Sequence, residues 1–282
     1  MSDNNIRLSF EFFPPKTDAG REKLIEVRNG LAAFEPEFFS MTYGAGGSTR
    51  ENTKGLVVQF NKEGFATAPH LSFGGDDSQT ISALIQDYKD AGIQRIVALR
   101  GDMPSGMGGA SQMVYANELV AFIRKHFGDS FHLEVAAYPE IHPEAKSYHQ
   151  DIQFLKNKLD AGANSAITQY FFNPDGFHFF MDRCQAAGID KPIYPGIMPI
   201  INLQNLARFS NLCGAEIPRW LYKALDAYGD DRESMQAFGI DVVTELCDIL
   251  LENGAPGLHF YTMNQLQPVQ TIVKNLGLML DA

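Results

Sequence analysis

The chain has 282 residues, 45% of them hydrophobic, and a formal net charge of -11 at pH 7. This length and hydrophobic content are sufficient for a large core, arranged as one large α/β domain or as two smaller ones. The acidic balance argues against nucleic acid and anionic membranes as partners, because both need clustered Lys and Arg, and it favours an enzyme with small-molecule ligands.

Short apolar runs rich in β-branched or aromatic residues alternate along the chain with segments of helical spacing. The apolar runs predict eight strands, at residues 7–13, 38–43, 67–73, 95–101, 132–138, 165–172, 193–198 and 257–262. The other segments predict helices at residues 17–33, 49–61, 77–91, 112–126, 148–161, 174–187 and 264–277, with a proline-interrupted helical region from 202 to about 253. Strict alternation of strand and helix implies a parallel sheet with right-handed crossovers.

Polar residues on one face of several strands favour a closed barrel over an open, doubly wound sheet. Helices cover both faces of an open sheet, so its strands should be apolar throughout. In this chain one alternation class is polar: Ser9, Glu11, Ser40, Thr42, His70, Ser72, His132, Glu134 and Tyr138. The opposite class is apolar: Phe10, Phe12, Phe39, Met41, Leu71, Phe73, Leu133, Val135 and Ala137. We therefore predict a (β/α)8 TIM barrel, one α/β domain over residues 1–282, with polar groups lining its interior for a ligand near the mouth.

The segment Ser-Phe-Glu-Phe-Phe-Pro-Pro-Lys, residues 9–16, ends the first strand and carries a candidate acid. Alternation places Glu11 on the face of Phe13 and opposite Phe10 and Phe12, and two prolines then stop the strand. Burial among aromatic rings should raise the pKa of Glu11, which suits a general acid near neutral pH. The alternative is a surface or salt-bridged glutamate on an edge strand.

Cysteine spacing and the N-terminal residues bear on the compartment. The three cysteines, Cys184, Cys213 and Cys247, are far apart and contain no Cys-x-x-Cys pair, so neither a zinc ribbon nor a redox dithiol is indicated. The N-terminus lacks the apolar segment of a secretory signal, and no apolar run approaches the roughly 20 residues that span a bilayer. We expect a cytoplasmic protein that binds neither membrane nor nucleic acid.

Two loops at strand ends each allow more than one interpretation. Residues 44–48, Gly-Ala-Gly-Gly-Ser, lack the third glycine of a dinucleotide fingerprint, so a turn that brings backbone N–H groups close to a ligand is preferred. The stretch from Tyr138 to Lys146 holds Glu140, His142 and Glu144, which suit a metal site, whereas His142 with Lys146 and Lys158 suits a phosphate. A solvated polar loop is the third reading, and of these the phosphate loop is favoured over metal.

A third strand end, Arg100-Gly101-Asp102, leads into a glycine-rich loop at residues 103–109 that is typical of a mobile lid. Arg100 suits a phosphate, and Asp102 suits the N–H groups of a heterocycle. The alternative is a salt bridge between these two residues.

The strand ends form an ordered set of motifs: Ser-Phe-Glu-Phe-Phe-Pro-Pro-Lys, Met-Thr-Tyr-Gly-Ala, Ala-Pro-His-Leu, Ala-Leu-Arg-Gly-Asp, Ala-Ala-Tyr-Pro-Glu-Ile-His-Pro-Glu-Ala, Ala-Gly-Ala-Asn-Ser-Ala-Ile-Thr-Gln-Tyr-Phe-Phe, Pro-Gly-Ile-Met-Pro and His-Phe-Tyr-Thr-Met-Asn. As a set they resemble the bacterial methylenetetrahydrofolate reductases over essentially the whole chain. The resemblance implies a barrel that holds FAD and reduces 5,10-methylenetetrahydrofolate to 5-methyltetrahydrofolate with NADH or NADPH, in a ping-pong reaction that feeds methionine synthesis. It favours NADH and a homotetramer.

The resemblance also implies roles for particular residues. Glu11 corresponds to the general acid that protonates folate N10, and Asp102 to a carboxylate beside the flavin ring and the pterin. The positions that match the FAD environment are Thr42, Tyr43, Ala45, His70, Arg100, Gly101, Asp102, Tyr115, Ala116, Tyr138, His142, Ala145, Asp151 and Lys158. The positions that match the substrate site are Glu11, Asp102, Gln169, Asn205, Phe209 and Gln265. No resident metal is implied.

Four positions depart from the family pattern. Gln265 stands where some members have an arginine suited to the folate tail, so a charge-assisted contact is missing. Asn205 stands where glutamine is expected, and Phe154 and Asn157 replace polar or basic residues near FAD. Because the chain ends after the eighth strand and helix, we expect no C-terminal regulatory domain. The competing readings are a folate-barrel methyltransferase without flavin and an inert binding partner that kept the barrel.

Overall fold

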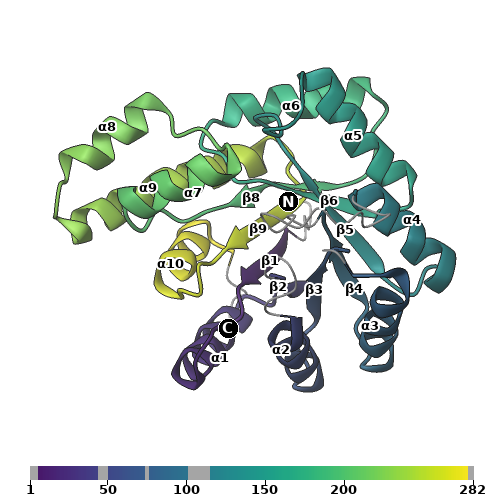
Figure 1. The fold of residues 1–282 in the computed structure, drawn as a ribbon. Coiled ribbons are helices and arrows are strands. Elements are labelled where there is room, and N and C mark those ends of the chain that lie inside the picture. The colour runs from purple at the N-terminus through teal and green to yellow at the C-terminus, as the bar shows by residue number, and fades with distance from the viewer. Residues whose placement is uncertain (1–5, 44–49, 74–75, 101–114, 279–282) are drawn as a thin grey trace.

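Nine parallel strand segments form a nearly closed barrel in the centre of the molecule, with helices around it (Figure 1). The structure is a computed structural model, and it describes residues 6–43, 50–73, 76–100 and 115–278. The strands are β1 Arg7–Phe12, β2 Phe38–Met41, β3 Thr67–Leu71, β4 Arg95–Ala98, β5 His132–Ala137, β6 Ser165–Thr168, β7 Ile193–Tyr194, β8 Gly196–Ile197 and β9 Gly257–Tyr261. Their order in the sheet is β7-β6-β5-β4-β3-β2-β1-β9-β8.

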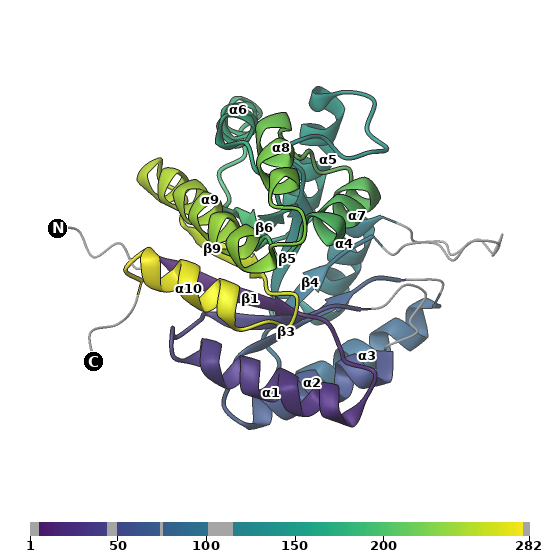
Figure 2. The ribbon, with the colours of Figure 1, turned by 90° about the vertical axis from the view of Figure 1, so that its left-hand side faces the viewer.

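Helices follow the strands in the predicted alternation. They are α1 Asp18–Ala32, α2 Arg50–Lys62, α3 Ser78–Asp90, α4 Ala116–Phe127, α5 Tyr148–Asp160, α6 Pro174–Ala186, α7 Leu203–Cys213, α8 Arg219–Ala227, α9 Arg232–Glu252 and α10 Gln267–Asn275. Helices α1, α2 and α3 lie on one side of the strands, and α6, α7 and α8 lie on the other (Figure 2). None of the helices in the described ranges has both the length and the apolarity needed to cross a bilayer.

Pro195 explains why the barrel has nine strand segments where eight strands are predicted. It separates β7 from β8, and proline has no N–H to donate to a neighbouring strand. On one side β7 pairs with β6, and on the other β8 pairs with β9, which pairs in turn with β1. The Pro195 carbonyl still accepts from the His259 N–H at 3.0 Å. The two segments together are the seventh strand, so the predicted TIM barrel is confirmed.

The predicted strands run too far at their carboxyl ends. The sixth, predicted to reach residue 172, ends at Thr168 in β6, and β2 and β3 also stop two residues early. The ladders end where the chain leaves the barrel wall to form the loops of the C-terminal rim. The region 202–253 consists of three helices, because Gly214 ends α7 in a left-handed conformation and Pro218 precedes α8.

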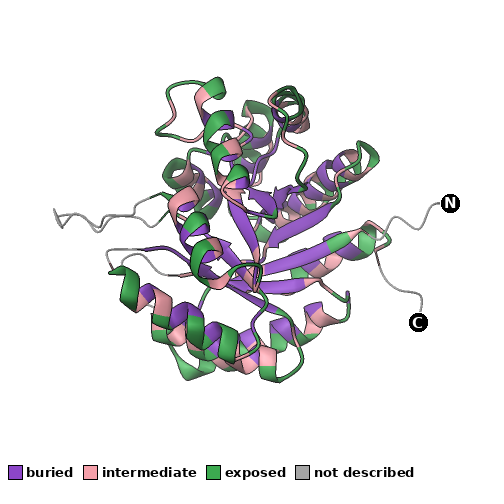
Figure 3. Ribbon diagram, turned by 90° about the vertical axis from the view of Figure 1, so that its right-hand side faces the viewer, coloured by how far each residue is buried: buried purple, intermediate pink, exposed green. Residues whose placement is uncertain are grey.

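Strand alternation divides the buried residues into two cores. The outward-facing side chains pack against the helices, as predicted: Phe10, Phe12, Phe39 and Met41. The Phe39 ring is tilted against Phe10 and stacked on Phe12. Figure 3 shows the strands as an almost continuous buried region inside a ring of helices whose outer faces are exposed. A separate small cluster inside the barrel consists of Phe38, Ala68, Val97 and Ile167.

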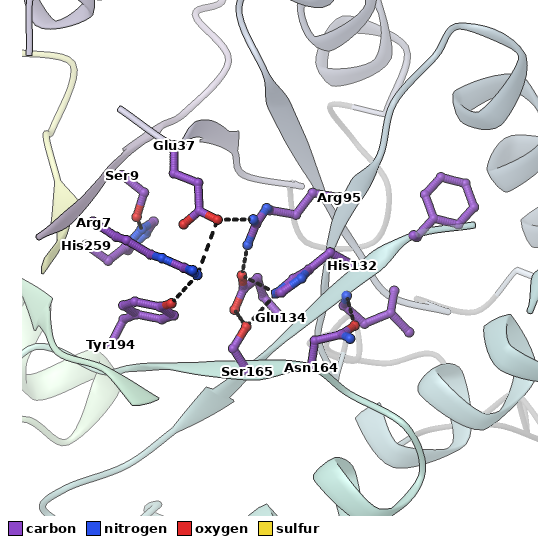
Figure 4. Close-up of polar contacts among 12 residues, drawn as sticks. Arg7, Ser9, Glu37, Arg95, His132, Glu134, Asn164, Ser165, Tyr194 and His259 are labelled. Carbon is purple, nitrogen blue, oxygen red and sulfur yellow. Dashed lines mark hydrogen bonds and ion pairs between the residues drawn. The ribbon is translucent and has the colours of Figure 1, made fainter. Parts of the chain in front are cut away.

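This small cluster is the middle one of three layers in the barrel interior. Ser40 and His70 lie two residues further along β2 and β3 than Phe38 and Ala68, toward the C-terminal end, and Glu11 of β1 is in register with Ser40. Glu11, Ser40 and His70 form the upper layer. Toward the N-terminal end lies a lower layer of paired polar groups: Arg7, Glu37, Arg95, His132, Glu134, Ser165 and Tyr194 (Figure 4). The apolar cluster therefore lies between two sets of polar groups, with Ser9 and His259 in register with Phe38 at the same level.

His132 and Glu134 correct part of the sequence interpretation. They were expected to line the interior for a ligand near the mouth, but they lie in the lower layer at the opposite end of the barrel. Glu134 is fully buried and its carboxylate bonds Arg95, His132 and Ser165. Burial opposes its charged form, but the bonds from His132 and Arg95 hold the pKa of Glu134 below its usual range. Position along a strand, which alternation does not reveal, decides the layer.

Candidate active site

The carboxylate of Glu11 is held between two imidazoles at the C-terminal end of the barrel. Its Oε2 lies 3.1 Å from His70 Nε2, which comes from β3, and 3.4 Å from His259 Nε2, which comes from β9. The Glu11 side chain retains 16% exposure, while His259 is fully buried. Three strands that are far apart in sequence thus place one acid and two potential proton carriers together.

The proton affinity of Glu11 differs from the sequence prediction. Burial raises the pKa of this carboxyl, as expected, but charge and hydrogen bonding from His70 and His259 outweigh it and lower the pKa to about 2. The prediction of a raised pKa is therefore wrong for the ligand-free protein. Its physical reason is that the rings beside the carboxylate are imidazoles rather than the phenyl rings of the same segment, so the carboxylate is ionised at neutral pH.

His259 is a site residue that the sequence analysis did not single out. Its Nδ1 lies 2.7 Å from Ser9 Oγ, so that Ser9, His259 and Glu11 form a chain of polar contacts (Figure 4 includes the first of these). The ring also stacks on Phe38 of the middle layer, with 6.1 Å between centroids. Alternation along β9 was the available signal, since His259 and Tyr261 share one face of that strand.

The turn that follows β9 fastens the end of β1. Thr262 Oγ1 donates to the Glu11 carbonyl at 2.6 Å, and Asn264 Nδ2 donates to the Phe13 carbonyl at 2.8 Å. The Phe13 N–H donates in return to Asn264 Oδ1 at 3.1 Å. Met263 and Asn264 both have a φ of 54°, in the left-handed region, so the turn is tightly bent. These bonds fix the backbone that carries Glu11.

Phe13 does not help to bury the acid. Phe13 is 44% exposed, although alternation placed it on the face of Glu11, among the aromatic rings expected to bury the acid. The strand ends at Phe12, so alternation no longer applies at the next residue. Phe10 and Phe12, by contrast, seat β1 against the helices as predicted.

The segment after β5, residues 138–147, folds back on α5. Asp151 Oδ2 accepts from the His142 N–H at 2.9 Å, and the His142 ring meets the Tyr138 ring edge-on at 4.6 Å. Lys158 Nζ donates to the Ala136 carbonyl and lies 5.9 Å from the Tyr138 ring centroid. Burial lowers the pKa of Lys158 to about 8. Four residues matched to the FAD environment therefore form one connected cluster.

Arg100 and Tyr115 lie together beside this cluster. The Arg100 guanidinium is 5.5 Å from the Tyr115 ring centroid and pairs with Glu144. The Tyr115 ring is 57% exposed at the start of α4, and Ala116 follows it in the first turn. Ala145 lies in the same region, where its N–H donates to the His142 carbonyl at 2.8 Å. A cation and an open ring face are thus available at the rim.

Three of the predicted cofactor positions, Ala45, Gly101 and Asp102, lie outside the described residues, as do the glycine-rich turn at 44–48 and the loop at 103–109. The alternative of an Arg100–Asp102 salt bridge falls there too. Thr42 and Tyr43, at the end of β2, are described and half-buried. The Tyr43 hydroxyl is buried without a hydrogen-bond partner among the described residues, and burial raises its pKa.

Two of the predicted substrate residues lie on α7, and two lie at strand ends. Phe209 is half-buried and Asn205 is exposed on that helix. Gln169 follows β6 and its Oε1 accepts from the Tyr170 N–H at 3.0 Å, while the Gln265 N–H donates to the Thr262 carbonyl at 3.0 Å. All four come from the C-terminal half of the chain.

Neither possible metal ligands nor a cavity at the opposite end of the barrel points to a different active site. Within the described ranges, no three His, Cys, Asp or Glu side chains are grouped so that they would hold a metal ion. A cavity of about 400 Å³ opens at the other end of the barrel, where Glu37, Arg95 and His132 line it. These three groups are already paired with one another or with Glu134. Chemistry in this fold occurs at the C-terminal strand ends, where the Glu11 carboxylate lies between His70 and His259.

The fold defines a (β/α)8-barrel protein, with a candidate ligand site at the C-terminal ends of its strands. A family model described as methylenetetrahydrofolate reductase matches residues 1–277. The chain belongs to that family, as the strand-end motifs indicated.

Similar proteins agree with this assignment. A 5,10-methylenetetrahydrofolate reductase from Pectobacterium carotovorum is 40% identical over 277 residues, covering 98% of this chain and 92% of the relative. The Escherichia coli K12 protein of the same name is 39% identical, covering 96% and 91%. A relative from Arabidopsis thaliana, named methylenetetrahydrofolate reductase (NADH) 1, is 39% identical, and the match covers 96% of this chain but 48% of the plant protein.

A solved structure from Clostridium thermocellum is similar in fold. It superposes with a TM-score of 0.60 at 16% identity, covering 95% of this chain and 92% of the other. It is described as an uncharacterized protein that binds two copies of 5-methyl-5,6,7,8-tetrahydrofolic acid. At this identity the likeness bears on the barrel fold alone.

Proposed function

We propose that this protein is an FAD-dependent reductase that converts 5,10-methylenetetrahydrofolate to 5-methyltetrahydrofolate with NADH or NADPH. Family membership supports the reaction, and the carboxylate of Glu11 between His70 and His259 is the observation that carries its assignment to this end of the barrel. NADH is the expected donor, since three plant relatives are named for it. A cytoplasmic homotetramer that feeds methionine synthesis completes the proposal.

The residues at the rim fit an FAD molecule. The buried Tyr43 hydroxyl has no hydrogen-bond partner in the part of the chain that the structure describes, and a bound group would supply one. Arg100 and the exposed Tyr115 ring offer a cation for a diphosphate and a surface for an aromatic base. Thr42, His70, Tyr138, His142, Ala145, Asp151 and Lys158 lie around the same strand ends, with Ala116 at the start of α4, and Ala45, Gly101 and Asp102 complete the proposed FAD contacts. FAD, when bound, accepts hydride from a nicotinamide and supplies it to the folate one-carbon unit.

Glu11 serves as the acid that opens the folate five-membered ring. Protonation of folate N10 releases an iminium at N5, which is then ready to accept hydride, and such proton transfer contributes about 10²- to 10⁴-fold to a rate. The carboxylate must first acquire a proton, which its pKa of about 2 opposes. We infer that bound folate excludes water from the carboxyl group, so that the effect of burial, which favours its protonated form, prevails.

The other proposed residues position the substrates. Asp102 lies close to the flavin and the pterin in this proposal, while Gln169 and Phe209 bind the folate and the nicotinamide in turn against one flavin face. Asn205 and Gln265 complete the folate site. Because Gln265 is uncharged, the folate tail lacks the charge-assisted contact that arginine gives some members.

The test of the proposal is optical. Purified protein, reconstituted with FAD, should be yellow, and anaerobic NADH should bleach its flavin absorbance. A flavoprotein that neither NADH nor NADPH bleaches would rule out the reductase. A colourless protein that does not retain FAD would instead favour the flavin-independent methyltransferase.

A variant separates the acid from the rest of the site. Glu11→Gln keeps the size of the side chain but has no transferable carboxyl proton. We expect it to retain FAD and its reduction by NADH and to lose folate turnover by about 10²-fold or more. Stopped-flow absorbance measures the two half-reactions separately, and near-normal folate turnover would reject Glu11 as the acid.

A further inference from the structure

A single side chain connects two segments that are distant in sequence at the rim. Glu140, in the segment that follows β5, accepts a hydrogen bond at Oε2 from the Glu216 N–H at 2.7 Å. Glu216 lies in the connection between α7 and α8, and its own side chain is exposed. Burial raises the pKa of Glu140, while the Glu216 N–H opposes that shift. The contact lies at the surface, and it joins two segments that are 76 residues apart in the chain.

A second contact brings the same two segments together. Gly214 ends α7 with a φ of 77°, and a Cβ added there would lie 2.8 Å from Pro143 Cγ. Only glycine combines this left-handed conformation with so close an approach. Ala215, the next residue, is buried in the main core. The end of α7 therefore rests directly on the segment 138–147.

Helix α7 is also attached to the barrel wall near Gln169. Tyr170 OH lies 3.0 Å from Ser210 Oγ on α7 and 3.4 Å from Cys213 Sγ at its last residue. The helix carries Phe209, while the segment 138–147 carries Tyr138 and His142. One attachment thus joins α7 to the strand wall, and the other joins it to the residues proposed to hold the cofactor.

We propose that Glu140 is a positioning residue that couples the cofactor segment 138–147 to α7, so that bound FAD orders the helix that presents Phe209 to the folate. The inference rests on the proposed function of these residues. Glu140 itself touches neither the reacting atoms nor the folate. When the link is broken, folate binding should be weaker. Because such coupling is reciprocal, bound folate should also strengthen FAD binding less in the broken variant than in the wild type.

Amide hydrogen exchange of the full-length protein, with and without FAD, tests the coupling. In the wild type, FAD should slow exchange in both 138–147 and 203–217. In Glu140→Ala, the slowing should persist in 138–147 and be lost in 203–217. Glu140→Gln retains an acceptor oxygen and should restore it, and Glu216→Gln, which leaves the backbone N–H in place, should behave as the wild type.

Kinetics provides the second measurement. Loss of this hydrogen bond, which has a charged acceptor, should raise the KM for folate in Glu140→Ala by about fivefold, with reduction of the flavin by NADH little changed. Gly214→Ala, which disturbs the link from the other side, should raise it in the same way. Unchanged FAD-dependent protection of 203–217 in Glu140→Ala, or equal defects in the Ala and Gln variants, would overturn the inference. Failure of the wild type to bind FAD would instead overturn the proposed function.

Discussion

Two opposing influences set the proton affinity of Glu11, and their balance is the chemical centre of the site. Burial is the largest of them and favours the neutral carboxyl, whereas His70 and His259 favour the carboxylate. A general acid with a pKa of about 2 would hold almost no protons at neutral pH. The imidazoles therefore decide whether this residue is an ion-pair partner or an acid.

Removal of one imidazole should reverse this balance. In His259→Ala the carboxylate loses a hydrogen bond and a nearby charge, so the pKa of Glu11 should rise by about 1 to 3 pH units. Carboxyl carbon NMR of labelled protein over a pH series measures this. Ser9→Ala is the matched control, because Ser9 contacts the imidazole at Nδ1 and leaves the Glu11 contact in place. A Glu11 pKa that stays near 2 in His259→Ala would show that His70 alone sets it.

The same ion contacts should make folding stability depend on pH in acid. The pKa of Glu11 is about 2 in the folded protein, compared with an ordinary value of 4.5. A depressed carboxyl pKa stabilises the fold above the ordinary value, by about 3 kcal/mol here, and that contribution disappears as the pH falls from 4.5 towards 2.

Urea denaturation across this pH range measures the effect. Glu11→Gln should lose less stability between pH 4.5 and pH 2 than the wild type does. Glu22→Gln, on the exposed face of α1, should follow the wild-type curve. Parallel curves for wild type and Glu11→Gln would contradict the assigned pKa.

At the scale of elements, β8 closes the barrel through a glycine that has no room for a side chain. A Cβ on Gly196 would lie 2.1 Å from the Thr168 carbonyl oxygen and 2.6 Å from Tyr261 Cε2. The Gly196 N–H also donates to Thr168 Oγ1 at 2.9 Å. The chain therefore passes unusually close to β6 and β9 at this point.

Gly196→Ala should destabilise the protein by about 1 to 3 kcal/mol, because backbone atoms must move to accommodate the methyl group. Gly55→Ala, on α2, is the control: apart from its chain neighbours and the adjacent backbone of α2, no heavy atom of the described residues lies within 4 Å of its added Cβ, and replacing a helical glycine should stabilise the fold by about 0.5 to 1 kcal/mol. Urea midpoints of the two variants measure the difference. Equal midpoints would mean that the closure at β8 is looser than the structure indicates.

Elements and site residues were predictable to different degrees for identifiable reasons. Alternation along β1 and β2 correctly assigned Phe10, Phe12, Phe39 and Met41 to the helix side, because burial enforces a period of two. The pKa of Glu11 was not predictable, because it depends on His259, which is 248 residues away in the chain. Single-strand patterns carry no information about which strands meet, nor about the layer a residue occupies, as His132 shows.

At the scale of the whole molecule, the barrel interior keeps function and stability at opposite ends. The upper layer contains Glu11, whose side chain is mostly buried but still reaches solvent, while in the lower layer the fully buried Glu134 is satisfied by Arg95, His132 and Ser165 (Figure 4). The buried side chains of Phe38, Ala68, Val97 and Ile167 lie between them. Charges in the lower layer should therefore have little effect on chemistry at the upper one.

A variant in the lower layer tests this separation. Glu134→Ala leaves the Arg95 guanidinium with Glu37 as its remaining carboxylate in the described structure, in a site where its side chain is only 14% exposed. Breaking a buried ion pair on one side costs about 3 to 5 kcal/mol, which urea denaturation should reveal. The rate of flavin reduction by NADH, measured on folded protein, should stay within about twofold of wild type, since the middle layer separates the two sites.

A paired replacement distinguishes the effect of an unpaired charge from the effect of lost volume. Arg95→Met with Glu134→Leu removes both charges, and because no uncompensated ion then remains in the interior, much of the lost stability should return. Recovery in the double variant would attribute the loss to the unpaired charge rather than to lost volume. A fall in the flavin reduction rate that parallels the loss of stability in Glu134→Ala would instead mean that the lower layer reaches the active site, and the interior would then act as one unit.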